Sequence, residues 1–259
     1  MKKIIAWFIL LLPIFYLILL SFHSYHKFPV VIPKTFTWLY WSDVLIKNSL
    51  FYRGLISSIA IGFMTACLST LIGFMTGRAV VYHLNGFTKT IAIIIAIPLM
   101  IPGMIMFLGM QQILIQSPFI NSIIGVVIAH TVICIPYTSN IAIAYFTGIP
   151  REFEEVTKTL GGKGIITLKK VILPLILPGI LMSMSISFLI SNTEYFSTFL
   201  IGGGKVVSLS MLMFPYITNA DYGHTAVMGL IFIGVHSLLF LGMQILIKSR
   251  QNKVFYEGD

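Results

Sequence analysis

Charged residues are scarce in this sequence. Asp, Glu, Lys and Arg make up 10% of its 259 residues, while 57% are hydrophobic. A soluble domain carries roughly 25% charged residues. The composition therefore excludes an ordinary soluble domain and indicates an integral membrane protein, with room for about six membrane-crossing helices and short loops.

Cysteine is rare and a nucleotide-binding motif is missing. Cys67 and Cys134 both lie in apolar runs, so they are interpreted as small hydrophobic residues without a disulfide framework or the spacing of a metal site. The phosphate-binding pattern G-x-x-x-x-G-K-[ST] is absent. The GGGK run that ends at Lys205 does not supply it, because no strand precedes that run. Energy from a nucleotide would have to come from another chain.

Acidic residues number eight against 17 basic ones, which gives a net charge of +9. An excess of this size can indicate nucleic-acid binding, but most of the basic residues cluster in loops on one side of the predicted membrane helices. Twelve lie in segments assigned to the inner side and five in segments assigned to the outer side. This asymmetry predicts that both termini face the cytoplasm, with membrane lipid and no nucleic acid as partners.

The apolar runs predict an all-α fold in one transmembrane domain. Six spans are expected at about 4–21, 54–77, 90–114, 122–146, 171–193 and 223–247. The first run follows Lys2 and Lys3 and has a cleaved signal peptide as its alternative. A retained anchor is favoured, because the run is too long for the apolar part of a signal and no A-x-A site follows. A short interfacial helix is expected at 36–45, where aromatic residues are dense.

Proline and histidine interrupt two of these spans. Pro98, Pro102 and Gly103 predict a kink in the third span, which either lines a path through the membrane or packs against other helices. His130 in the fourth span is expected to make an interhelical hydrogen bond rather than to bind a ligand, because an isolated polar group is costly in a membrane.

The longest polar stretch lies between the fourth and fifth spans, at 147–170. It holds five of the 17 basic residues and three of the eight acids, so it must face water, and its basic excess places it in the cytoplasm. A short helix is expected there, with Phe153, Val156 and Leu160 on one face. Gly161 is expected to end this helix in the left-handed conformation. The stretch is either an ordinary solvated loop or a docking helix.

The same stretch resembles the EAA signature of the membrane subunits of binding-protein-dependent ABC importers. That signature reads E-A-A-x-x-x-G, then a spacer, then I-x-L-P. The chain has EVTKTLG at 155–161 and VILP at 171–174. It departs from the signature at Val156 and Thr157, which replace the alanines, and at Val171, which replaces the isoleucine.

The resemblance implies a type I, MetI-like importer fold with six transmembrane helices and a cytoplasmic coupling helix that fits a cleft on a separate ATPase subunit. The residues expected at that contact are Glu152, Phe153, Glu155, Val156, Thr159, Leu160, Gly161 and Pro174. The implied partners are two ATPase subunits that carry ATP and Mg, a second permease subunit, identical or sister, and an extracytoplasmic substrate-binding protein. The chain would be a multi-pass transport subunit of the bacterial plasma (inner) membrane, without a cofactor of its own, and not an enzyme.

The end of the fifth span bears on the substrate. Glu194 there either attracts a cation or pairs with Lys205 at the surface. In the run N-T-E-Y-F the acid falls where polyamine permeases carry an acidic residue, so the chain resembles the spermidine/putrescine branch most. Phosphonate, thiamine, sulfate and iron importers share the same core and stay open as alternatives. The candidate path residues are Ser187, Ser191, Asn192, Glu194 and Tyr195.

Ser183, Ser187 and Ser191 recur at every fourth residue of the fifth span. This spacing puts them on one helix face. The stripe either lines the path or packs against neighbouring helices through its small residues.

Two rival classes are disfavoured. An ion-coupled secondary transporter needs a membrane-buried carboxylate, whereas Glu194 and Asp221 lie at span ends. A membrane enzyme would need partners for the intramembrane histidines, His130 and His236, and the sequence shows no carboxylate or nucleophile signature near either.

Overall fold

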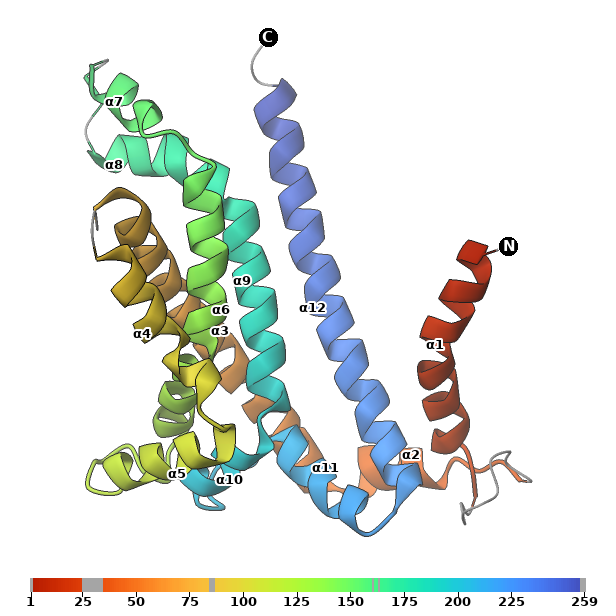
Figure 1. Cartoon of the computed structure of the whole chain (residues 1–259). Coiled ribbons are helices and arrows are strands. Elements are labelled where there is room, and N and C mark those ends of the chain that lie inside the picture. The colour runs from red at the N-terminus through yellow and green to blue at the C-terminus, as the bar shows by residue number, and fades with distance from the viewer. Residues whose placement is uncertain (1, 25–34, 84–86, 160, 163, 257–259) are drawn as a thin grey trace.

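The computed structural model describes residues 2–24, 35–83, 87–159, 161–162 and 164–256 (Figure 1). Helices dominate, and the described residues contain no strand beyond an isolated bridge between His23 and Phe36. The all-α prediction is therefore confirmed. In chain order the elements are α1 (Lys2–Ser21), α2 (Leu39–Ser42), η1 (Asp43–Lys47), α3 (Ser49–Tyr82), α4 (Thr88–Met100), α5 (Gly103–Leu114), α6 (Ile123–Thr147), α7 (Glu152–Thr159), α8 (Gly164–Thr167), η2 (Leu168–Ile172), α9 (Leu173–Thr193), α10 (Tyr195–Gly202), α11 (Leu209–Thr218) and α12 (Tyr222–Tyr256).

Helices α3, α6 and α9 pack together as the centre of the molecule (Figure 1). Small residues of α3 let it approach α6 closely. At Gly77 the two helices are so near that an added Cβ would lie 2.9 Å from the carbonyl carbon of Ala142. Thr138 of α6 donates a hydrogen bond from its Oγ1 to the Ser69 carbonyl of α3 at 2.8 Å. In lipid, the hydrophobic effect does not drive helices together, so their association depends on the close packing that small residues permit.

Gly73→Ala is expected to destabilise this bundle by about 1–3 kcal/mol, because overpacking forces the backbones apart. An added Cβ at Gly73 would lie 2.7 Å from the backbone carbonyl carbon of Thr138. Thermal unfolding in detergent measures the effect. Gly109→Ala in α5 is the matched control, since a Cβ there meets no heavy atom within 4 Å. An unchanged midpoint for Gly73→Ala would contradict the close approach of α3 and α6.

The third expected span is not one helix. Helices α4 and α5 are bent by 100° relative to each other, where Ile101 is extended (φ −90°, ψ 130°) and Pro102 precedes α5. Proline cannot donate the backbone hydrogen bond that would continue α4, and it disfavours the helical conformation of the residue before it. The expected kink is confirmed, and whether the two helices together form the span expected at 90–114 stays a prediction.

Four helices among the described residues are long and apolar enough to cross a membrane, and five if α4 and α5 together count as one span. Two of them extend beyond the expected bounds: α3 covers Ser49–Tyr82 and α12 covers Tyr222–Tyr256. In α1 the apolar segment Ile9–Ser21 is shorter than the other candidates. The sixth span therefore stays a prediction.

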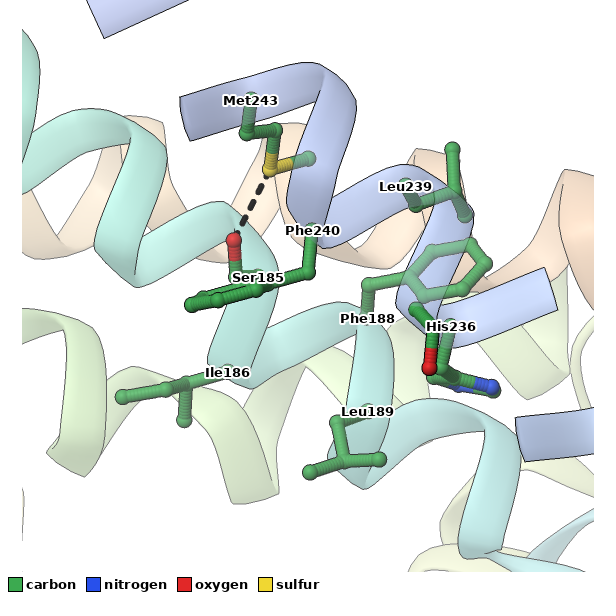
Figure 2. Close-up of a pocket in the computed structure, with 9 residues that line it drawn as sticks. Ser185, Ile186, Phe188, Leu189, His236, Leu239, Phe240 and Met243 are labelled. Atoms are coloured by element: carbon green, nitrogen blue, oxygen red, sulfur yellow. Dashed lines mark hydrogen bonds between the residues drawn. The ribbon is translucent and has the colours of Figure 1, made fainter. Parts of the chain in front are cut away.

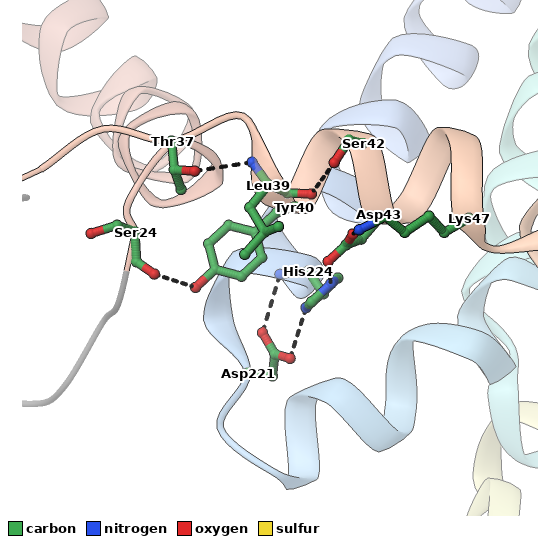
Figure 3. A network of polar contacts seen from close by, with 9 residues as sticks. All are labelled: Ser24, Thr37, Leu39, Tyr40, Ser42, Asp43, Lys47, Asp221 and His224. Atoms are coloured by element: carbon green, nitrogen blue, oxygen red, sulfur yellow. Dashed lines mark hydrogen bonds and ion pairs between the residues drawn. The ribbon is translucent and has the colours of Figure 1, made fainter.

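A polar network joins the start of α12 to the segment before α3 (Figure 3). Asp221 accepts hydrogen bonds from the backbone N–H of His224 at 3.3 Å and from its Nδ1 at 2.7 Å, which caps α12. The ring of His224 lies against Tyr40, and its Nε2 is 3.6 Å from Asp43 Oδ2. Lys47, 2.6 Å from Asp43, lowers the pKa of that carboxyl by hydrogen bonding to it. The helical segment that was expected at 36–45 is found at Leu39–Lys47, packed on α12.

Candidate functional site

The amphipathic helix of the central polar stretch is α7. It begins next to Pro150, whose carbonyl accepts the backbone N–H of Phe153 at 3.2 Å. Phe153 and Val156 are 50% and 55% exposed, and they are apolar side chains without a covering neighbour. Glu152, Glu155 and Thr159 are exposed as well. The helix therefore presents an uncovered apolar stripe beside acidic side chains.

The end of α7 has the conformation that its glycines predict. Gly161 has φ +78°, in the left-handed region. The N–H of Gly162 donates to the carbonyl of Thr157 at 2.9 Å, which is the bond of a Schellman cap. The predicted left-handed glycine is thus confirmed. Leu160, the third expected member of the apolar stripe, lies outside the described residues.

The segments on either side of α7 are tied to the central bundle. Tyr82, at the end of α3, donates its hydroxyl to the carbonyl of Ile149 at 2.9 Å, just after α6. On the other side α8, η2 and α9 follow one another without a gap, with Pro174 in the first turn of α9. Ile172 is buried in a cluster with Phe146 of α6. The segments that flank α7 are therefore in contact with α3, α6 and α9.

Figure 1 shows α7 and α8 at the opposite end of the bundle from α5, α10 and α11. At that opposite end, α9 stops at Thr193 and α10 starts at Tyr195. Glu194 between them is extended (φ −76°, ψ 94°). The break between α4 and α5 and the break between α9 and α10 both border one cavity.

This cavity has a volume of about 470 Å³ and is lined by residues of α5, α10 and α11: Gly103, Met104, Phe107, Glu194, Tyr195, Phe196 and Phe214. The rings of Tyr195 and Phe214 stack with centroids 4.1 Å apart. Among the described residues, the Glu194 carboxylate makes no ion pair with Lys205. The cavity thus presents one unpaired carboxylate among aromatic and apolar walls, which suits a cation with an apolar body.

The other three candidate path residues, Ser187, Ser191 and Asn192, are buried within the chain. Ser187 and Ser191 are buried, and their hydroxyls bond to Ser69 at 3.0 Å and to Thr65 at 3.4 Å. Asn192 is also buried and donates to the carbonyl of Phe188 at 2.9 Å. This is the geometry that the packing interpretation expects for the serine stripe. A role for these residues in the path stays a prediction.

His130 makes the interhelical hydrogen bonds that the sequence predicts. Its ring is 2% exposed, with Nδ1 2.7 Å from Ser191 Oγ of α9 and Nε2 2.7 Å from Ser197 Oγ of α10. Both ring nitrogens are therefore occupied by protein.

A second cavity, of about 310 Å³, lies between α9 and α12 (Figure 2). Its walls include Phe188, Phe240 and Met243, and Ser185 donates its hydroxyl to the Met243 sulfur at 2.8 Å. His236 is the one titratable side chain among the described residues that line it, and none of them is a carboxylate, lysine or arginine. The cavity at Glu194 therefore differs from it in having a carboxylate.

The sequence did not predict the hydrogen bond of Tyr82 to the segment before α7 or the residues of α5 and α11 that line the cavity. Tyrosine near a span end is common at membrane interfaces, so nothing local marks Tyr82 as a tether. Phe107 and Phe214 meet Glu194 only through the tertiary fold. Within the described residues, no group of three or more His, Cys, Asp or Glu side chains is arranged to hold a metal ion.

No family model matches the sequence. Among curated proteins, the spermidine/putrescine transport system permease PotC of Haemophilus influenzae is 25% identical over 185 residues, 71% of this chain and 71% of PotC. The glucose import system permease GlcU of Saccharolobus solfataricus is 23% identical over 249 residues, 90% of this chain and 85% of GlcU.

Chains of two solved ABC transporters also align with this chain. A chain of the bacterial ABC transporter that imports the acidic polysaccharide alginate aligns with a TM-score of 0.70 at 17% identity, covering 93% of this chain and 91% of that one. A chain of the inward-facing MetNI methionine ABC transporter aligns with a TM-score of 0.60 at 18% identity, covering 77% of this chain and 95% of that one.

The chain is an integral membrane protein with the MetI-like fold of ABC importer permeases. In sequence it is a relative of ABC transporter permease subunits, so the predicted resemblance is confirmed. These relatives are named as permeases, which supports a transport subunit rather than an enzyme.

Proposed function

We propose that this chain is the permease subunit of a type I ABC importer and that α7 is its coupling helix. The observation that carries the proposal is the uncovered stripe of Phe153 and Val156, on a helix whose two flanks are fixed to the central bundle. An exposed apolar face on an amphipathic helix is suited to a groove on a partner. The proposed partner is an ATPase subunit, because the structural neighbours are named as parts of ABC transporters, and ATP and Mg would belong to that subunit.

The proposed cycle is alternating access. Two ATPase subunits close on ATP and move two coupling helices, one from each permease subunit of the pair. The central helices then tilt as bodies around a shared path, open first to one side and then to the other. An extracytoplasmic binding protein delivers the cargo at the end that holds α5, α10 and α11. In this arrangement the chain lies in a bacterial inner membrane, with α7 and both termini on the cytoplasmic side.

We infer that the cargo is an organic cation, most simply a polyamine. The support is the unpaired Glu194 carboxylate in an aromatic cavity, together with the similarity to PotC. Relatives named for other cargoes, such as GlcU, keep a different small solute as the alternative. An anionic cargo would be repelled by a carboxylate in this position, and a neutral cargo would gain only a hydrogen bond from it.

Phe153→Asp is expected to weaken association with the ATPase subunit by about fivefold or more, because removing a hot-spot side chain of an interface costs over about 1 kcal/mol. Co-purification of the ATPase with tagged permease, at a series of salt concentrations, measures it. Phe119→Asp is the control, since Phe119 is an exposed aromatic residue between α5 and α6. Figure 1 shows α5 at the end of the bundle away from α7. Equal recovery of the ATPase with both variants would reject the docking role of α7.

A further inference from the structure

The break between α9 and α10 occurs without proline or glycine, so something outside the local sequence must hold it. The ring of His130 does so from α6. Its two nitrogens contact Ser191, three residues before Glu194, and Ser197, three residues after it, each at 2.7 Å. One imidazole thus bonds to both arms of the bent chain.

The contacts around this ring form a continuous buried network. Thr198 Oγ1 lies 3.3 Å from His130 Nε2 and donates to the carbonyl of Glu194 itself at 3.0 Å. Ser191 donates to Thr65 of α3 at 3.4 Å. The five side chains of this network are at most 3% exposed: His130, Ser191, Ser197, Thr198 and Thr65. A polar network whose members are all paired is rigid, because each broken bond would leave a buried group unsatisfied.

A neutral imidazole is sufficient for these contacts. Because Ser191 donates its one hydroxyl hydrogen to Thr65, Nδ1 of the neutral ring donates to Ser191, and Nε2 accepts from the Ser197 hydroxyl. Thr131, the next residue of α6, is a useful contrast. It is equally buried, but its hydroxyl bonds only to the Val127 carbonyl of its own helix. Of these two adjacent polar residues of α6, His130 contacts both arms of the α9–α10 break and Thr131 contacts neither.

We propose that His130 is a positioning residue: it clamps the α9–α10 break and thereby fixes the Glu194 carboxylate at the mouth of the cavity formed with α5 and α11. The clamp itself follows from the contacts, and only its meaning for the cargo rests on the proposed function. Without the ring, Ser191 and Ser197 lose their shared partner, and the angle at Glu194 is no longer set.

The clamp is tested first without transport. In the full-length protein with Cys67→Ser and Cys134→Ala, Glu194→Cys provides the one reactive thiol, and its labelling rate with a cationic methanethiosulfonate is measured. His130→Leu is expected to change that rate by about tenfold, a coupling usual for residues of one hydrogen-bond network. His130→Gln, which keeps a donor and an acceptor, and Thr131→Val are expected to stay near the parent rate. Ser197→Ala, a smaller change, should shift the rate in the same direction if His130→Leu fails to fold. Equal rates in all four variants would overturn the inference.

Uptake of radiolabelled putrescine and spermidine by the full complex in proteoliposomes then links the clamp to cargo. His130→Leu is expected to raise KM about tenfold alone and to add nothing in a Glu194→Gln background, because it acts through that carboxylate. Fully additive effects would overturn the positioning role. If Glu194→Gln leaves uptake unchanged while the labelling rates still differ, the proposed cation contact fails and the clamp stands.

Discussion

Gly161→Val is expected to uncouple ATP hydrolysis from transport. A β-branched residue held in the left-handed region costs on the order of 1–3 kcal/mol, which would reduce the population of the capped α7 conformation by about 5- to 150-fold. Gly161 has φ +78°, and the adjacent Gly162 N–H closes the cap on Thr157. Without the cap the last turn of α7 frays, and the stripe of Phe153 and Val156 no longer has a fixed direction. Transport and ATPase rates are measured together in proteoliposomes, and transport per ATP hydrolysed should fall.

Gly164→Ala is the matched control for this prediction. Gly164 begins α8, is not among the glycines with positive φ, and has no heavy atom within 4 Å of an added Cβ. Its variant should transport at the parent rate. Because the strain is local, the thermal midpoint of the bundle should be the same in both variants. Wild-type transport by Gly161→Val would remove α7 from the proposed role of coupling helix.

Glu194→Gln is expected to raise KM for putrescine and spermidine by about tenfold to a hundredfold. The change removes the charge of the one carboxylate among the described residues that line the cavity of α5, α10 and α11, and a hydrogen bond to a charged group contributes about 1.5–3 kcal/mol. The substitution preserves shape, so folding should be unaffected. Initial uptake rates over a range of cargo concentrations separate KM from the maximal rate.

Two controls accompany Glu194→Gln. Glu194→Asp keeps the charge on a shorter side chain and should fall between the parent and Glu194→Gln. Lys205→Gln should have no effect, because Lys205 does not pair with Glu194 in the described structure. Unchanged uptake kinetics in Glu194→Gln would remove the reason to prefer a polyamine over the other cargoes.

The elements that could be predicted are those with strong local signals. Apolar runs located α6 and α9 to within two residues, since hydrocarbon thickness fixes their length. The pair Gly161–Gly162 predicted the end of α7, because glycine enters the left-handed region without steric cost. Pro102 predicted a kink but not its size of 100°, which depends on where α5 finds its packing surface.

The candidate site could be predicted only in part, and the reason is tertiary. The break at Glu194 has no local marker, because it is held by His130 from a different helix. The serine stripe was ambiguous, because small polar residues serve both helix packing and water-filled paths in membranes. The structure places Ser187 and Ser191 against α3 and α6, a distinction that spacing along one helix cannot make.

The short length of α4 has a consequence for the depth at which cargo would rest. Its 13 residues rise about 20 Å at 1.5 Å each, against roughly 30 Å of hydrocarbon. If α4 starts at one membrane interface, it would end inside the hydrocarbon, where the open backbone at Ile101 and Pro102 is tolerable only beside water or protein. The cavity at Glu194 would then be a hydrated recess within the bilayer. A cation bound there would have a shorter thickness of low-dielectric hydrocarbon left to cross.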